Sequence, residues 1–140
     1  MTLETPDTIA STWMERVWNQ LDTDAIDELL TDDHVSYGIG DAIVGKAGWR
    51  EFHAAFSGAL SNIKLGIDDQ VVSGNRVAAA WSGTATHAAT GTPVTMSGMV
   101  FLRVEDGRVA EGRNSADFIP MLTQIGLVDE NAMARALGAV

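Results

Sequence analysis

The first sixty residues carry their hydrophobic positions at helical spacing. This spacing predicts an opening helix that begins near Pro6, a residue suited to the first helical position. Its apolar stripe consists of Ile9, Trp13, Met14, Val17, Trp18 and Leu21. The segment 22–30 predicts a second, short helix, and 34–39, HVSYGI, predicts a strand. A third helix is predicted over 47–60. Its apolar face consists of Trp49, Phe52, Phe56 and Leu60.

After residue 62 the hydrophobic period changes to two, which is typical of strands. Four strands are predicted, over residues 64–72, 76–88, 94–104 and 108–116. The pairs Gly74-Asn75 and Asp106-Gly107 favour tight turns, so we expect an antiparallel meander. Two short helices are predicted after the strands, over residues 117–126 and 130–137. This order predicts an α+β fold, with helices packed on one face of a curved antiparallel sheet.

The composition of the 140-residue chain limits the classes of protein to which it can belong. An apolar share of 46% is enough to bury one core, and we interpret residues 1–140 as a single domain. The absence of cysteine excludes disulfides and thiolate metal sites. Nine basic against nineteen acidic residues give a net charge of −10, which repels nucleic-acid phosphates. With no leader peptide and no apolar run of membrane length, we expect a soluble, cytoplasmic protein without nucleic-acid or membrane partners.

Small residues occupy many positions of the predicted sheet where larger aliphatic side chains are common. They are Ala78, Ala79, Ala80, Gly83, Ala85, Ala88, Gly98, Ala110, Gly112 and Ala116. One interpretation is a cavity between sheet and helices that accepts an apolar ligand. The other is a sheet face closely covered by a second subunit. Both can hold, on opposite faces of the sheet.

The three histidines are too far apart in sequence to form a local metal motif, and we expect no metal site. His53 falls on the inward face of the third helix, where it could act as a general acid or base or be a core histidine bonded to a carbonyl. His87 lies near a strand end and could reach a pocket mouth or face solvent. His34 follows two aspartates, and we expect it to be exposed. Tyr37 could offer its hydroxyl to a ligand carbonyl, or pack with that hydroxyl at the surface.

The stretch 111–120, EGRNSADFIP, joins the last strand to a helix. Strand alternation places Asn114 on the same face as Gly112, which leaves open space beside it. Asn114 cannot transfer a proton, so it can only orient a ligand or polarise a carbonyl. Asp117 precedes the helix and is suited to capping it, which would lower its pKa and make it a poor general acid.

Five separated blocks of the chain resemble SnoaL-like polyketide cyclases of the nuclear transport factor two-like superfamily. The blocks are VWNQLDTDAIDELLTDDHV, GKAGWREF, GNRVAAAWSGTATH, FLRVEDGRVAE and DFIPMLTQIG, within residues 7–128. The resemblance implies a cone, in which a strongly curved antiparallel sheet wraps around helices and encloses a deep apolar pocket. It also implies a homodimer and chemistry without a cofactor.

The chain departs from this family in its acid and base residues. Cyclases of this type commonly carry a Trp-Asp pair on the last strand, whose aspartate is the proposed acid/base, and here Arg113 and Asn114 resemble that pair. The more distant resemblance to ketosteroid isomerases places Met14, Gly38 and Val100 where those enzymes carry the oxyanion tyrosine, the base aspartate and the second oxyanion acid. None of these three can do that work.

Two functional hypotheses follow. In the first, the protein is a cyclase- or isomerase-type enzyme that acts on a carbonyl-containing ligand, with His53, His87 or Asp117 handling protons. In the second, it is a non-catalytic small-molecule binder that has lost the acid/base aspartate. A third possibility is a dimerisation module with a filled cone. In the first two, a cavity of roughly 300–1,000 Å³ is expected. Its predicted lining consists of Trp13, Tyr37, Trp49, His53, Phe56, Met96 and Asn114.

Overall fold

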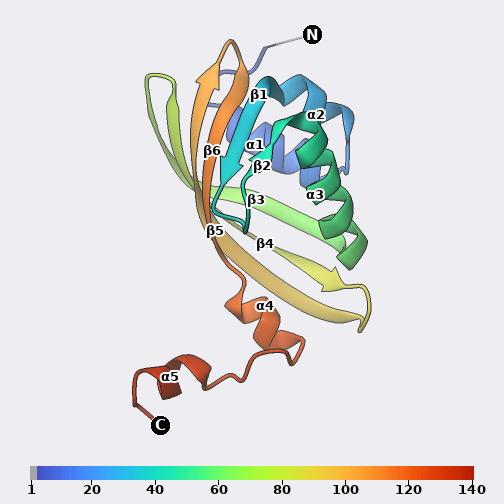
Figure 1. The fold of residues 1–140 in the computed structure, drawn as a ribbon, viewed down its shortest axis with the longest axis vertical. Helices are drawn as coiled ribbons and strands as arrows, with labels where there is room; N and C mark the ends of the chain where they lie inside the picture. The colour runs from blue at the N-terminus through green and yellow to red at the C-terminus, as the bar shows by residue number, and fades with distance from the viewer. Residues whose placement is uncertain (1–2) are drawn as a thin grey trace.

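The computed structural model describes residues 3–140 and shows a curved six-stranded sheet with helices packed against its inner face (Figure 1). The helical elements are α1 (Ile9–Trp13), the π-helix η1 (Met14–Asn19), α2 (Asp24–Leu29), α3 (Gly45–Ala59), α4 (Ile119–Gln124) and α5 (Ala132–Ala136). The strands are β1 (Leu30–Tyr37), β2 (Ile43–Val44), β3 (Leu60–Ser73), β4 (Arg76–His87), β5 (Thr92–Glu105) and β6 (Arg108–Asp117). Their order in the sheet is β2-β1-β6-β5-β4-β3. The predicted α+β class with a curved sheet is confirmed.

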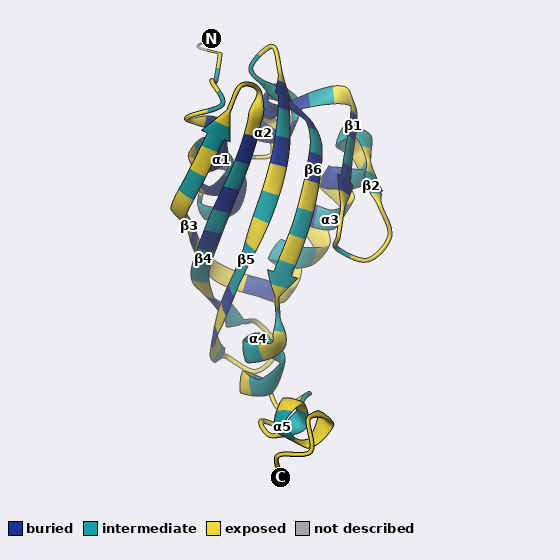
Figure 2. Ribbon diagram, turned by 90° about the vertical axis from the view of Figure 1, so that its left-hand side faces the viewer, coloured by how far each residue is buried: buried dark blue, intermediate teal, exposed yellow. Residues whose placement is uncertain are grey.

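Strand alternation separates the two faces of the sheet. Along β5, Met96 and Leu102 are buried against the helices, whereas Met99 and Phe101 lie on the outer face. Figure 2 looks onto this outer face, with α1, α2 and α3 behind the sheet. The core therefore lies on the inner side, between β3–β6 and the helices.

The hydrophobic spacing predicted a single α-helix at the start of the chain. In the structure this segment is not uniformly α-helical. After Trp13 the backbone widens into the π-helix, in which the Gln20 N–H donates to the Glu15 carbonyl over 2.9 Å. Asn19 ends this segment and bonds both backbone groups of Leu65 on the edge strand β3. π-Helical turns are often found at functional sites, and this one carries cavity residues described below.

The strand β1 differs most from the prediction. It begins at Leu30, four residues before the predicted strand, and it pairs in parallel with β6, with Tyr37 beside Arg113. The sheet is thus antiparallel except at this one pair. The expectation of an antiparallel sheet was wrong at this pair, because β1 lies beside β6, the last strand of the meander, and runs in the same direction.

The chain ends in two short helices. α4 packs near β5, and α5 lies away from the sheet in both views (Figures 1 and 2). Among the described residues, no helix is long and apolar enough to cross a membrane.

Candidate functional site

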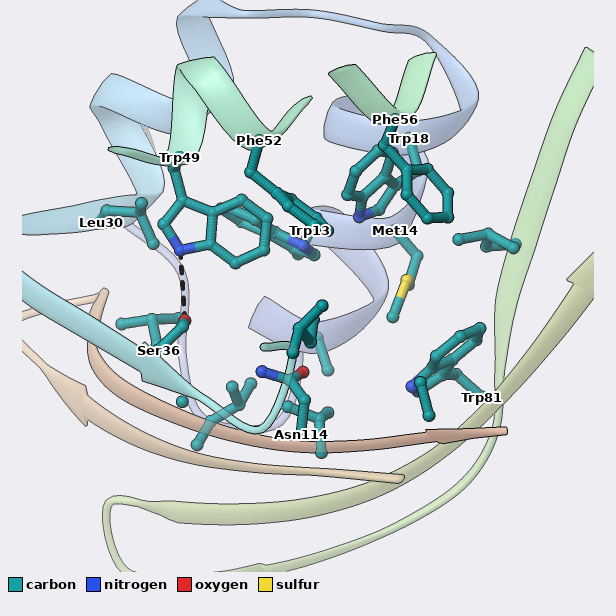
Figure 3. Close-up of a pocket in the computed structure, with 18 of the residues that line it drawn as sticks. Trp13, Met14, Trp18, Leu30, Ser36, Trp49, Phe52, Phe56, Trp81 and Asn114 are labelled. Atoms are coloured by element: carbon teal, nitrogen blue, oxygen red, sulfur yellow. Dashed lines mark hydrogen bonds between the residues drawn. The ribbon is translucent and has the colours of Figure 1, made fainter. Parts of the chain in front are cut away.

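A cavity of about 80 Å³ lies between the inner face of the sheet and the helices. All four tryptophans of the chain line it, Trp13 and Trp18 from α1 and η1, Trp49 from α3 and Trp81 from β4. Figure 3 shows the indoles of Trp13, Trp18 and Trp49 on the helical side, above the sheet. The wall is therefore mainly aromatic and apolar.

The aromatic side chains pack on one another edge to face. The ring centroids of Trp13 and Trp49 are 4.9 Å apart at 80°, and those of Trp49 and Phe52 are 5.4 Å apart at 85°. Trp18 contacts Phe56 in the same way, at 5.1 Å. These rings fill most of the cone, so the space is well below the predicted range of roughly 300–1,000 Å³. That expected size was wrong.

Polar groups gather where β1 meets β6. Ser36 Oγ lies 2.7 Å from His34 Nε2. It also accepts a hydrogen bond of 3.1 Å from the indole N–H of Trp49, the dashed line in Figure 3. His34 Nδ1 lies 2.9 Å from the Val109 carbonyl, which can only accept, so Nδ1 carries the proton of the neutral ring. Nε2 is then the acceptor, and the Ser36 hydroxyl donates to it.

The position of His34 corrects the expectation that it is exposed. Its side chain is 1% exposed and Ser36 is 4% exposed. Burial lowers the pKa of His34, against the smaller opposing effects of the Val109 carbonyl and of the Asp33 and Glu111 carboxylates. His34 is accordingly neutral at pH 7, with an unprotonated Nε2 held against a hydroxyl.

Asn114 adds a second polar group on the same side. Its Nδ2 donates to the Tyr37 carbonyl over 3.2 Å, and its side chain lines the cavity. Gly112 lies between Asn114 and Ser36. A Cβ atom at Gly112 would stand 3.1 Å from Ser36 Oγ and 4.0 Å from Asn114 Nδ2. The missing side chain therefore leaves Ser36 Oγ open to the cavity.

The structure brings together only part of the predicted lining. Among the residues expected there, the cavity is lined by Trp13, Trp49, Phe56, Met96 and Asn114. Tyr37 does not line it, because strand alternation turns its ring outward beneath the Arg113 guanidinium, 4.9 Å from the ring centroid. His53 is buried outside the cavity wall, with Nε2 2.7 Å from the Val17 carbonyl.

The other two candidates for proton transfer also lie outside the lining. His87 Nδ1 is 2.9 Å from Thr90 Oγ1 at the end of β4. Asp117 is exposed, and its Oδ1 accepts the backbone N–H of Ile119 over 3.1 Å at the start of α4. Neither side chain touches the cavity in this conformation.

Sequence reasoning missed His34 and Ser36. The sequence places His34 and Ser36 on the same face of one strand. It does not show whether that face points to the core, because this depends on a register shift between Leu30 and Val35. Trp18 and Trp81 were also missing from the predicted lining. Among residues 3–140, no three His, Asp or Glu side chains come together as a metal site would require.

The chain is similar to known proteins in sequence and in fold. The family model described as SnoaL-like polyketide cyclase matches residues 8–125. No curated protein matches the chain significantly. IdmH from Streptomyces antibioticus, a proposed polyketide cyclase, is 26% identical, with a TM-score of 0.77 over 86% of this chain and 98% of its own.

Two further structures are similar in fold. AclR from Streptomyces galilaeus, a proposed hydroxylase, is 24% identical with a TM-score of 0.77, over 88% of this chain and 96% of its own. A Catenulispora acidiphila protein with a ketosteroid isomerase-like fold, solved with trimethylamine, is 19% identical. Its TM-score is 0.77, over 89% of this chain and 95% of its own.

Proposed function

Because the chain belongs to the SnoaL-like polyketide cyclase family, we propose that it binds a small, largely apolar, carbonyl-containing ligand in the cavity between sheet and helices. One observation carries the proposal. The cavity wall is aromatic and aliphatic on nearly every side, and its polar groups converge at the junction of β1 and β6. Ligand sites typically combine such an apolar wall with a few placed polar groups.

The aromatic wall favours a flat ligand. Indole and phenyl rings pair with a conjugated ring edge to face or in an offset stack. Trp13 and Phe118 are half-buried in the wall, and we propose that they turn aside for any ligand larger than the present space. Asn114 has one amide proton on the Tyr37 carbonyl and a second that is available to a ligand carbonyl.

We favour a cyclase- or isomerase-type reaction that needs no cofactor, because apolar side chains surround a buried hydroxyl and a buried imidazole in the cavity wall. His53, His87 and Asp117 remain hypotheses as proton carriers, although each is bonded to protein outside the cavity. The alternative is a binder without catalysis. It is favoured by Asn114, an amide at the position that resembles the family's acid/base aspartate.

Intrinsic fluorescence tests the binding proposal directly, because every tryptophan lines the cavity. A panel of flat aromatic ketones, led by anthraquinone, should quench the emission saturably, and saturated ketones of equal size should quench it less. Asn114→Ala should weaken binding of the ketones. Val44→Thr, at an exposed position of β2, is the control and should bind like wild type. No saturable quenching by any member would overturn the proposal.

We also propose a homodimer through the outer face of the sheet. Exposed apolar side chains gather there, with Met99 60% and Phe101 42% exposed. The small residues Ala78 and Ala80 lie beside them on β4 and would let a second sheet approach closely. A cytoplasmic location and a single domain over residues 1–140 stay predictions.

A further inference from the structure

We propose that Ser36 and His34 form a proton relay that accepts the proton of a ligand hydroxyl conjugated to a carbonyl, an enol or a phenol. The inference rests on the proposed ligand site. Among residues 3–140 that line the cavity, Ser36 carries the one hydroxyl group and His34 the one titratable side chain. Any proton transfer inside this cavity by protein side chains therefore has these two groups available.

The hydrogen bonds around His34 set the direction of the relay. The Val109 carbonyl holds the proton on Nδ1, so Nε2 has a free electron pair for the Ser36 proton. An imidazole whose second nitrogen is fixed by an acceptor is the arrangement that general bases use. Here the Val109 backbone carbonyl fixes the imidazole, as a carboxylate does in many enzymes.

The surroundings of Ser36 Oγ leave one position for a ligand. The oxygen is bonded to its own Cβ and proton, and one lone pair accepts the Trp49 N–H. The second lone pair has no protein donor among the hydrogen bonds of residues 3–140. Because Gly112 has no side chain, nothing from that residue covers the oxygen. A free acceptor in an apolar cavity calls for a ligand donor, which a hydroxyl supplies and a simple ketone does not.

The net step transfers one proton from the ligand hydroxyl to His34. The ligand O–H bond breaks and a new O–H bond forms on Ser36 Oγ, while the original Ser36 proton moves to His34 Nε2. The products are a ligand enolate or phenolate and an imidazolium at His34. Asn114 Nδ2 lies on the far side of the Gly112 gap, where it can donate to the conjugated carbonyl oxygen as negative charge spreads to it. Return of the proton to a ligand carbon completes a tautomerisation.

A purely structural role for the same hydrogen bonds predicts different behaviour. In that case His34 only ties β1 to β6, and ligand ionisation does not depend on it. His34→Asn separates the two roles, because its amide can still donate to the Val109 carbonyl but offers no base to Ser36. Gly112→Ala keeps both relay side chains and puts a methyl group 3.1 Å from Ser36 Oγ, which must give way by a few tenths of an ångström.

The probe is a nitronaphthol, whose phenolate absorbs at longer wavelength than its phenol. Tryptophan quenching measures its binding, and absorbance measures the ionised fraction of the bound probe across pH. We expect the apparent pKa of the bound probe to be about one unit lower in wild type than in Ser36→Ala and His34→Asn, a tenfold change in ionisation. Gly112→Ala should weaken binding of the nitronaphthol more than that of anthraquinone, and Val44→Thr should match wild type.

The outcomes separate the relay from the ligand site. If the probe binds to every variant with the same ionised fraction, the relay is wrong and the ligand site stands. If anthraquinone binds but the nitronaphthol does not, the relay is again overturned. If neither compound quenches wild type, the proposed function fails together with the relay. Circular dichroism of each variant confirms that the comparison is made on folded protein.

Discussion

The side-chain amide of Asn114 and the backbone carbonyl of Tyr37 lie 3.2 Å apart, across the parallel pair of β1 and β6. The bond requires a donor at residue 114, because a carbonyl can only accept. The last strand of the sheet is thereby tied to the first, next to the cavity. The Asn114 amide thus has a structural partner as well as a place in the cavity wall.

Asn114→Asp should make stability depend on pH. A carboxylate would face the Tyr37 carbonyl and apolar walls, so the folded state favours the protonated form and raises the pKa of the new carboxyl above its unfolded value of about 3.9. The protonated acid can donate to Tyr37, so the variant should be only slightly less stable than wild type near pH 4. As the pH rises towards the folded pKa, the unfolded chain loses its proton first and stability falls.

Urea unfolding at pH 4 and pH 7.5 measures this effect. We expect a loss of about 1–3 kcal/mol relative to wild type at pH 7.5 and a much smaller loss at pH 4. Asn114→Ala, which does not titrate, should lose a similar amount at both. A loss for Asn114→Asp that is equal at the two pH values would contradict the assigned hydrogen bond.

Gly38 should tolerate no side chain. Its φ of +98° is rarely adopted by other residues, and a Cβ atom would stand 1.8 Å from the Asn114 carbonyl oxygen. We expect Gly38→Ala to cost about 3 kcal/mol or more in unfolding free energy, or to prevent folding. Gly66→Ala is the matched control, because nothing lies within 4 Å of its Cβ position. It should stay within about 0.5 kcal/mol of wild type, and equal losses would refute the close approach.

Much of the fold could be predicted because it follows from local patterns. The change of hydrophobic period and the tight turns place β3 to β6 close to their observed limits. The partner of β1 could not be found this way, since its pairing with β6 joins residues more than seventy positions apart. The run Asp32-Asp33-His34 has the polar composition of an exposed loop, so its place in β1 does not follow from the local pattern. In the structure His34 is buried in the core.

The cavity between the sheet and the helices is smaller than the predicted one, and only part of the predicted lining surrounds it. Small residues on the sheet suggested open space, but a Cβ atom at Gly98 would stand 2.8 Å from the Trp81 ring. The glycine therefore accommodates an indole and does not leave a void. Side-chain filling of this kind depends on rotamers that strand alternation does not specify.

The proposed dimer can be tested by charging the outer face of the sheet. Val71, Ala78, Phe101, Arg113 and Tyr37 form one row across five strands, centred on Phe101. Wild type should sediment as a dimer at micromolar concentration. Phe101→Glu combined with Met99→Glu should give a folded monomer, because taking carboxylates out of water into the interface costs several kcal/mol.

The control for the dimer is Val44→Glu, which adds one carboxylate at an exposed position on β2. It should remain dimeric. A monomeric wild type would overturn the proposal, and so would a double variant that stays dimeric.

His34 makes a separate contribution to stability that depends on pH. Burial lowers its pKa in the folded protein, while the Val109 carbonyl and the Asp33 and Glu111 carboxylates oppose this effect. The unfolded chain protonates this histidine near pH 6.5, at a pH where the folded protein still holds it neutral. The wild type should therefore lose stability as the pH falls below about 6.5, by up to about 1.4 kcal/mol per pH unit, until the folded pKa is reached.

His34→Asn removes this titration and keeps a donor for Val109. At pH 8 it should be less stable than wild type by about 1–2 kcal/mol, because the Ser36 hydroxyl loses its acceptor. The gap should narrow as the pH falls to 5.5, since only the wild type bears the cost of a histidine that stays neutral. Urea unfolding at pH 8, 6.5 and 5.5 measures the gap, with Val44→Thr expected to run parallel to wild type. Parallel profiles for wild type and His34→Asn would show that His34 titrates alike in the folded and unfolded chain, and that the buried, neutral imidazole described here is wrong.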